Sequence, residues 1–286
     1  MLEEKLKNSS YRIDAVIVDA NFTRKDFTPS DETDVSGLRT AMLLREGYKH
    51  LPFYLFTQRL NLSDLIEEYE LDYFKDNDAI FIKGDDDGLL NLLVRIKNDV
   101  DKINSAEFQI DTLYKNELNY FQVFDKQCNA KSYNLIRELL IQSREGSLCG
   151  TEDYFNKFRS EILENMKAVA IHFGLAPKGL SLNDFSRFLC LKEVEVNEEK
   201  YKLNKEILPR ALHLLMGHVV MMVQDGSHKR DVRFGVHQFV SENNDKLIIL
   251  SLLFGIIEII SWFIPYLATH TDKQENKANW QLNGSK

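Results

Sequence analysis

The sequence predicts an α/β unit followed by an all-helical unit, and three observations lead to this prediction. Three short apolar runs, at residues 13–19, 51–57 and 79–83, each end in a polar or charged side chain. Segments with helical spacing of apolar residues separate these runs. After residue 105, strand signals nearly vanish and helical periodicity dominates. Strands that alternate with helices require right-handed crossover connections, and the sheet is therefore expected to be parallel.

The first unit is predicted to cover residues 1–104. Gly47 marks the end of one of its helices, and Ser63 is a good cap for the start of another. In chain order we expect a helix at 2–8, a strand ending at 19, a polar loop at 23–36, a helix at 38–47, a strand ending at 57, a helix at 64–70, a strand ending at 83, a turn at 84–88 and a helix at 89–103.

The second unit is predicted to cover residues 105–270, followed by a polar tail at 271–286 that we expect to be frayed. A strand pattern appears in it only as a short segment at 193–198. Helical spacing predicts helices at 108–124, 131–144, 152–173, 181–191, 205–223, 232–241 and 246–267.

Charge and cysteine content narrow the function classes. The chain has 286 residues and a formal net charge of −8. Residues 1–104 hold 21 acidic and 14 basic side chains, so this unit should repel nucleic acid and could attract a cation or a basic partner, unless its acidic residues only form a solvated surface. The three cysteines form no CxxC pair, which argues against a zinc site or a disulfide framework and favours a cytoplasmic protein.

The three side chains that close the apolar runs are the first candidate site. They are Asp19, Thr57 and Lys83. Because the carboxyl ends of parallel strands meet at one edge of a sheet, we expect these side chains to lie together. A carboxylate, a hydroxyl and an ammonium at one place form an arrangement suited to a phosphoryl group.

Residues 10–104 resemble the later part of a receiver domain of bacterial response regulators. The apolar runs match the third, fourth and fifth strands of that flavodoxin-like parallel sheet, and the first two strands are missing. The resemblance implies that Asp19 is a phospho-acceptor, Gly37 the glycine after the acceptor loop, Thr57 the switch hydroxyl and Lys83 the lysine that contacts the phosphoryl group. A histidine kinase would then be a partner in a phosphorelay.

The chain departs from the receiver pattern at the metal site. A receiver holds Mg²⁺ with an acidic pair on its first strand, whereas here Asp19 alone supplies few oxygen ligands. Asp31, Glu32 and Asp34 lie in the long loop and could supplement it, although a solvated loop is the simpler interpretation. Two outcomes stay open: phosphorylation of Asp19 that draws in Thr57 and Lys83, or a purely structural pair of Asp19 and Lys83.

Residues 209–263 resemble, at a distance, the helical HEPN superfamily, some of whose members are ribonucleases that use an arginine followed closely by a histidine. Arg230 and His237 have that spacing, which would supply a cation for the phosphate and a base for the ribose hydroxyl. The spacing is not specific, because Arg45 and His50 also fit it. The resemblance gives an alternative function as a metal-independent endoribonuclease acting on RNA in bacterial conflict or phage defence.

Residues 247–268 are apolar on nearly all sides and long enough to span a bilayer. Glu258 lies near the middle, where a carboxylate costs about 2.5–3.5 kcal/mol on insertion into a membrane. We therefore expect a buried core helix, with membrane association as the alternative.

The function that these observations favour is signalling or regulatory rather than enzymatic. A degenerate receiver-like unit would control a helical unit that binds a protein partner or a second copy of the chain, as a homodimer.

Overall fold

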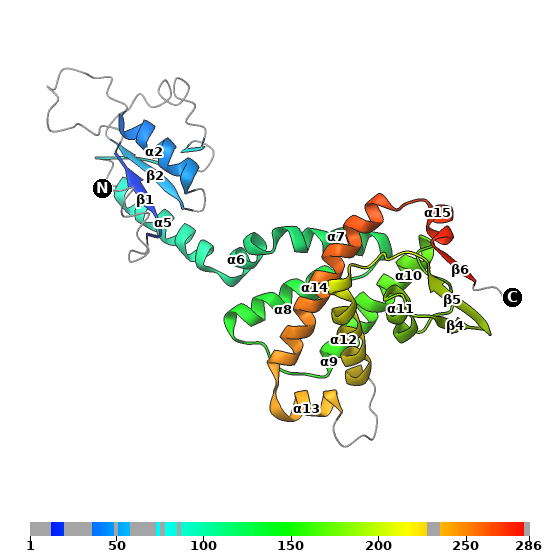
Figure 1. The fold of residues 1–286 in the computed structure, drawn as a ribbon. Helices are drawn as coiled ribbons and strands as arrows, with labels where there is room; N and C mark the ends of the chain where they lie inside the picture. Colours follow the sequence, from blue (N-terminus) through cyan, green and yellow to red (C-terminus); the bar gives the residue numbers. More distant parts are fainter. Residues whose placement is uncertain are drawn as a thin grey trace. The chain divides into compact units, whose positions relative to one another are not determined.

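A computed structural model describes residues 13–19, 36–48, 51–57, 73–74, 78–84, 87–227 and 235–282. The chain divides into two compact units, residues 1–108 and 109–286 (Figure 1). The predicted helices at 2–8 and 64–70 and most of the predicted loop at 23–36 lie outside the described residues.

The first unit contains a small parallel sheet. It consists of β1 (Val16–Val18), β2 (Phe53–Thr57) and β3 (Ile80–Ile82), in the order β1-β2-β3. Leu55 pairs with Val18 on one side and with Ile80 on the other, which places β2 in the middle. The three apolar runs thus form the parallel strands that the sequence predicts.

Helices accompany this sheet, as the α/β prediction requires. They are α2 (Ser36–Gly47) and α5 (Gly88–Asn104), and in Figure 1 the strands lie between them. Consecutive residues of β2, Phe53, Tyr54 and Leu55, have exposed fractions of 0%, 1% and 0%. Because consecutive side chains point to opposite faces of a strand, both faces of β2 are buried, which is typical of a parallel sheet.

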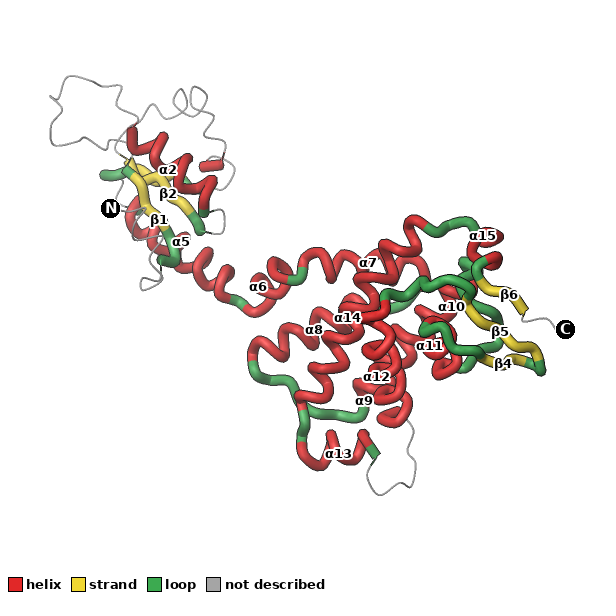
Figure 2. The backbone as a smooth tube through the Cα atoms, in the orientation of Figure 1, coloured by secondary structure: helices red, strands yellow, loops and turns green. Residues whose placement is uncertain are grey.

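The second unit is predominantly helical (Figure 2). The division between the two units falls inside α6, which begins before residue 109. The helices are α6 (Ala106–Leu113), α7 (Lys115–Cys128), α8 (Ser132–Glu145), α9 (Asp153–Lys157), the π-helix η1 (Phe158–Leu163), α10 (Glu164–His172), α11 (Leu182–Leu189), α12 (Arg210–Ser227), α13 (Val236–Asn243), α14 (Lys246–Thr269) and α15 (Lys273–Ala278).

The apolar helix α14 packs against α7, α8 and α12 in the core of this unit. Its exposed residues, including Leu247, Phe254, Glu258 and Pro265, follow one another at helical spacing and form one strip. Glu258 therefore keeps its carboxylate at the surface of the unit. Within the described residues, α14 alone is long and apolar enough to cross a membrane, and 56% of its apolar window is buried inside the protein. A core helix meets the same criteria.

Three predicted helices differ from the structure. The helix expected at 205–223 begins at Arg210, because a proline disfavours helical backbone in the residue before it and Pro209 therefore sets the start. The helix expected at 108–124 is divided at Tyr114 into α6 and α7. The helix expected at 152–173 forms, but its middle third is the π-helix η1.

The predicted polar tail at 271–286 is wrong in its described part. That part forms α15 and β6 (Trp280–Leu282), which completes an antiparallel sheet with β4 (Val194–Val196) and β5 (Glu199–Leu203) in the order β4-β5-β6. Side chains of this segment donate hydrogen bonds to backbone carbonyls and so fix its position. Asn276 is 1% exposed, and its Nδ2 donates to the carbonyls of Phe173 (2.8 Å) and His270 (2.9 Å). Trp280 Nε1 donates to the Gly174 carbonyl at 2.8 Å.

The three cysteines are unpaired and differ in environment. Burial raises the pKa of the Cys128 thiol to about 11, whereas Cys149 is exposed. Because the thiolate is the reacting species, roughly one Cys128 in a thousand is reactive near pH 8. We expect iodoacetamide to label Cys149 first, and labelling of Cys128 to accelerate about tenfold per pH unit below pH 11. Peptide mass spectrometry would follow both sites; equal rates in the folded protein would contradict the prediction.

Candidate functional site

The structure brings Asp19 and Lys83 together. Asp19 follows β1 directly, Lys83 follows β3 directly, and Lys83 Nζ lies 2.5 Å from Asp19 Oδ2. The two strands flank β2, so the ion pair spans the carboxyl edge of the sheet. The side chains are 29% exposed for Lys83 and 37% exposed for Asp19. The ion pair is therefore partly shielded from water but still accessible from solution.

The backbone and a neighbouring ring fix the position of Lys83. Its amide N donates to the Thr57 carbonyl at 2.7 Å, which extends the pairing of β3 with β2 by one residue. Its Nζ also lies 5.6 Å from the centroid of the Phe56 ring, within the range of a cation–π contact. The next residue, Gly84, has a φ of +90°, a conformation that glycine adopts without strain. The chain therefore turns immediately after the lysine.

Thr57 is the last residue of β2 and has no exposed surface. It thus lies beneath the surface of this edge, whereas the ion pair is accessible to solvent. Gly37 is the second residue of α2, so the glycine matched to the receiver pattern begins a helix. Asp31, Glu32 and Asp34, the predicted supplementary ligands, lie outside the described residues.

Mg²⁺ binding at this edge stays a prediction, and the described residues include one of its expected ligands, Asp19. No group of three histidine, cysteine, aspartate or glutamate side chains that could hold a metal occurs among them. Mg²⁺ requires several oxygen ligands in near-octahedral geometry, and Oδ2 of Asp19 accepts a hydrogen bond from the Lys83 ammonium. The ammonium itself supplies positive charge beside this carboxylate.

The second predicted pair, Arg230 and His237, is only half described. Arg230 lies in the segment 228–234, outside the described residues, and His237 lies in the first turn of α13. Asp225 Oδ2 accepts from the amide of Val236 at 2.9 Å and so holds the start of this helix. His237 Nδ1 is buried and has no hydrogen-bond partner among the residues that the structure describes. A catalytic role for the pair stays a prediction.

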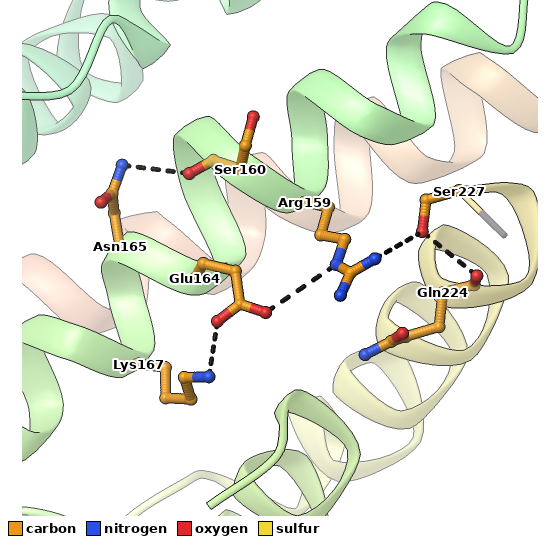
Figure 3. A network of polar contacts seen from close by, with 7 residues as sticks. All are labelled: Arg159, Ser160, Glu164, Asn165, Lys167, Gln224 and Ser227. Atoms are coloured by element: carbon orange, nitrogen blue, oxygen red, sulfur yellow. Dashed lines mark hydrogen bonds and ion pairs between the residues drawn. The ribbon is translucent and has the colours of Figure 1, made fainter. Parts of the chain in front are cut away.

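A polar network surrounds the π-helix η1, and sequence reasoning missed it (Figure 3). Glu164 lies between two cations: its Oε1 is 3.8 Å from Arg159 Nε, and its Oε2 is 2.5 Å from Lys167 Nζ. Arg159 also donates from Nη1 to Ser227 Oγ, at 3.4 Å, which connects η1 to the end of α12.

The wide turn of η1 exposes carbonyl groups that a side chain satisfies. Asn165 Nδ2 donates to the carbonyls of Ser160 (3.2 Å) and Glu161 (2.9 Å), as Figure 3 shows in part. π-Helical segments are rare and occur frequently at functional sites. No periodicity in the sequence distinguishes this segment from an ordinary α-helix. The one available signal for the π-helix is Asn165, which lies four to five residues after these carbonyls.

No family model, curated protein or solved structure matches this chain. The Asp19–Lys83 pair joins two strands of the sheet at its carboxyl edge, where ligands of parallel sheets bind. The contacts at η1 are structural, because they join neighbouring turns of this helical segment and connect it to the end of α12.

Proposed function

We propose that this protein is a signalling or regulatory protein in which the α/β unit controls partner binding or self-association of the helical unit. The observation that supports this function is the ion pair between Asp19 and Lys83 at the carboxyl edge of the parallel sheet. A receiver-like, flavodoxin-like origin of the first unit belongs to the same proposal. Its support is the order of the three strands, with Thr57 as the last residue of β2 and with Asp19 and Lys83 directly after β1 and β3.

The proposed switch is a change of partner for Lys83. Attack of an Asp19 oxygen on the phosphorus of a phosphoryl donor would form an O–P bond while the bond to the leaving group breaks. The product carries roughly −1.5 to −2 charges and additional acceptor oxygens. The ammonium of Lys83 would then pair with phosphoryl oxygens instead of the carboxylate. Because the Lys83 amide is bonded to β2, this change would be transmitted to the turn at Gly84.

The test is a phosphorylation experiment on the full chain with acetyl phosphate as donor, in buffer with and without Mg²⁺. We expect the wild-type protein to gain the mass of one phosphoryl group and to change its oligomeric state, measured by light scattering after size exclusion. Asp19→Asn should gain no phosphoryl group. Lys83→Ala should still be phosphorylated on Asp19. Its oligomeric state should nevertheless stay that of the unphosphorylated protein, because the ammonium that would pair with the phosphoryl oxygens is missing.

The matched control is Asp14→Asn, which removes an exposed carboxylate just before the same strand. It should behave as wild type. If Asp19→Asn and Lys83→Ala leave the oligomeric state and its response to acetyl phosphate unchanged, the switch is refuted. The pair would then be a structural contact, and exchanging the two residues, Asp19→Lys with Lys83→Asp, should restore the stability that either single change removes.

A further inference from the structure

A polar groove lies in the helical unit, along the first half of α7. Its volume is about 460 Å³, a size typical of small-molecule sites. Residues 115, 118, 119 and 122 have the spacing of one helical face, so α7 supplies the floor. The last turn of α6 and the start of α8, which packs beside α7, complete the groove (Figure 1). The lining residues used below are Asp111, Asn116, Leu118, Asn119, Gln122 and Tyr133, together called the α7 groove.

The residues that α6 and α8 contribute are held in position by contacts outside the groove. Asp111 accepts hydrogen bonds from Nε and Nη2 of Arg137, at 2.7 and 2.8 Å, and this guanidinium lowers the pKa of the Asp111 carboxyl. Tyr133 is the second residue of α8, and Asp125 Oδ2 accepts from its amide at 2.9 Å. The half-buried Tyr133 ring also packs against the core of the unit. Both residues are therefore in place before a ligand arrives.

The groove offers many groups that both donate and accept hydrogen bonds. The side-chain amides of Asn116, Asn119 and Gln122 and the hydroxyl of Tyr133 are of this kind. Within the described part of the chain, none of these four groups has a hydrogen-bond partner. The Asp111 carboxylate has about four acceptor positions, and Arg137 occupies two of them. A ligand rich in hydroxyl groups, each a donor and an acceptor itself, matches this set.

The charged groups of the lining do not select for an ion. The lining contains one carboxylate, Asp111, and one ammonium, Lys115, beside four neutral polar side chains. The carboxylate is already paired with Arg137. Leu118, which is 4% exposed, and the Tyr133 ring add apolar surface to the lining. Neutral hydrogen bonds and a small apolar contact are therefore the main interactions available to a ligand.

We propose that the α7 groove binds a neutral disaccharide. Its hydroxyl groups complement the amides, the phenol and the carboxylate, and the C–H face of a sugar ring complements Leu118 and the Tyr133 ring. The volume of about 460 Å³ equals that of roughly fifteen water molecules at about 30 Å³ each, which admits two sugar rings. The proposal does not depend on phosphorylation of Asp19. It gives the helical unit a chemical input of its own.

The test is saturation-transfer NMR on the full chain with maltose, cellobiose, lactose and sucrose as probes. We expect at least one of them to bind, and the open-chain polyol sorbitol, which has no ring face, to bind several-fold more weakly. Gln122→Ala and Tyr133→Phe should each weaken the bound disaccharide about two- to tenfold, as expected for loss of one neutral hydrogen bond. Gln127→Ala, the same change as Gln122→Ala at an exposed position of α7 outside the groove, should leave the affinity unchanged.

Two results would overturn the proposal. The first is that no disaccharide gives a signal stronger than that of sorbitol. The second is that Gln122→Ala and Tyr133→Phe bind like the Gln127→Ala control, which would place the sugar elsewhere on the protein. Tyr133→Phe removes one oxygen atom that has no partner within the described residues, so this variant keeps the fold even if Gln122→Ala is less stable. No phosphoryl donor is present, and failure here leaves the proposed switch at Asp19 standing.

Discussion

Replacing Gly226 with alanine is expected to lower the free energy of unfolding of the helical unit by about 2–3 kcal/mol. A Cβ at this position of α12 would lie 2.4 Å from Cγ and Cδ1 of the Phe155 ring, closer than atoms can approach. Alanine is the better helix former by about 1 kcal/mol, so the overlap has to exceed that gain for the protein to lose stability. We expect it to do so because Phe155 has no exposed surface and cannot swing into solvent.

Gly217 in the same helix gives the matched control. A Cβ there would meet no heavy atom within 4 Å. Gly217→Ala should therefore stabilise the protein by about 0.5–1 kcal/mol, the intrinsic helix preference of alanine. Replacing glycine with alanine in α12 is thus predicted to raise the free energy of unfolding at position 217 and to lower it at position 226. The difference isolates the contact with Phe155 from the backbone effect.

Urea unfolding followed by tryptophan fluorescence measures this difference. Both tryptophans, Trp262 and Trp280, belong to the helical unit, so the signal reports on that unit alone. Phe155→Leu combined with Gly226→Ala should recover part of the loss, because the smaller side chain removes the overlap. Equal stability of Gly226→Ala and Gly217→Ala would show that α12 and α9 separate at no cost, and would contradict the tight packing.

The sequence predicted those features that depend on local pattern or on a general topological rule. The three strands of the parallel sheet were visible as apolar runs, and the meeting of Asp19 with Lys83 followed from the rule that carboxyl ends of parallel strands share an edge. That rule needs only strand order and direction. It does not fix side-chain depth, which is why Thr57 was expected at an accessible site and lies fully buried.

The features that escaped prediction depend on contacts between distant parts of the chain. β6 pairs with β5 through residues such as Trp280 and Leu203, and the alternation in these polar segments is too short to be recognised. The polar segment before β6 is ordered by the side-chain amide of Asn276, which bonds to the Phe173 carbonyl far away in sequence. None of these partners can be identified before the fold is known.

Replacing Asp125 with alanine is expected to cost the helical unit about 2–4 kcal/mol, although Asp125 has no ion pair within the described part of the chain that explains this loss. The carboxylate lies on α7 and caps α8: Oδ1 accepts from the Ser132 amide (3.0 Å) and hydroxyl (2.5 Å), and Oδ2 accepts from the Tyr133 amide (2.9 Å). Lys131, which directly precedes α8, provides no side-chain cap. Removing such a cap costs about 0.5–2 kcal/mol, and leaving a buried hydroxyl unsatisfied adds about 1–3 kcal/mol.

Asp111 shows why this carboxylate differs from one in a surface ion pair. Asp111 accepts two hydrogen bonds from Arg137, at 2.7 and 2.8 Å, and this guanidinium lowers the pKa of the Asp111 carboxyl. Yet its side chain is 45% exposed, and water replaces a lost contact there, so Asp111→Ala should cost at most about 1 kcal/mol. Ser132 is 0% exposed, and water cannot replace Asp125. In urea unfolding, Asp125→Asn should retain part of the stability that Asp125→Ala loses. Equal losses for Asp111→Ala and Asp125→Ala would show that burial of the cap contributes nothing.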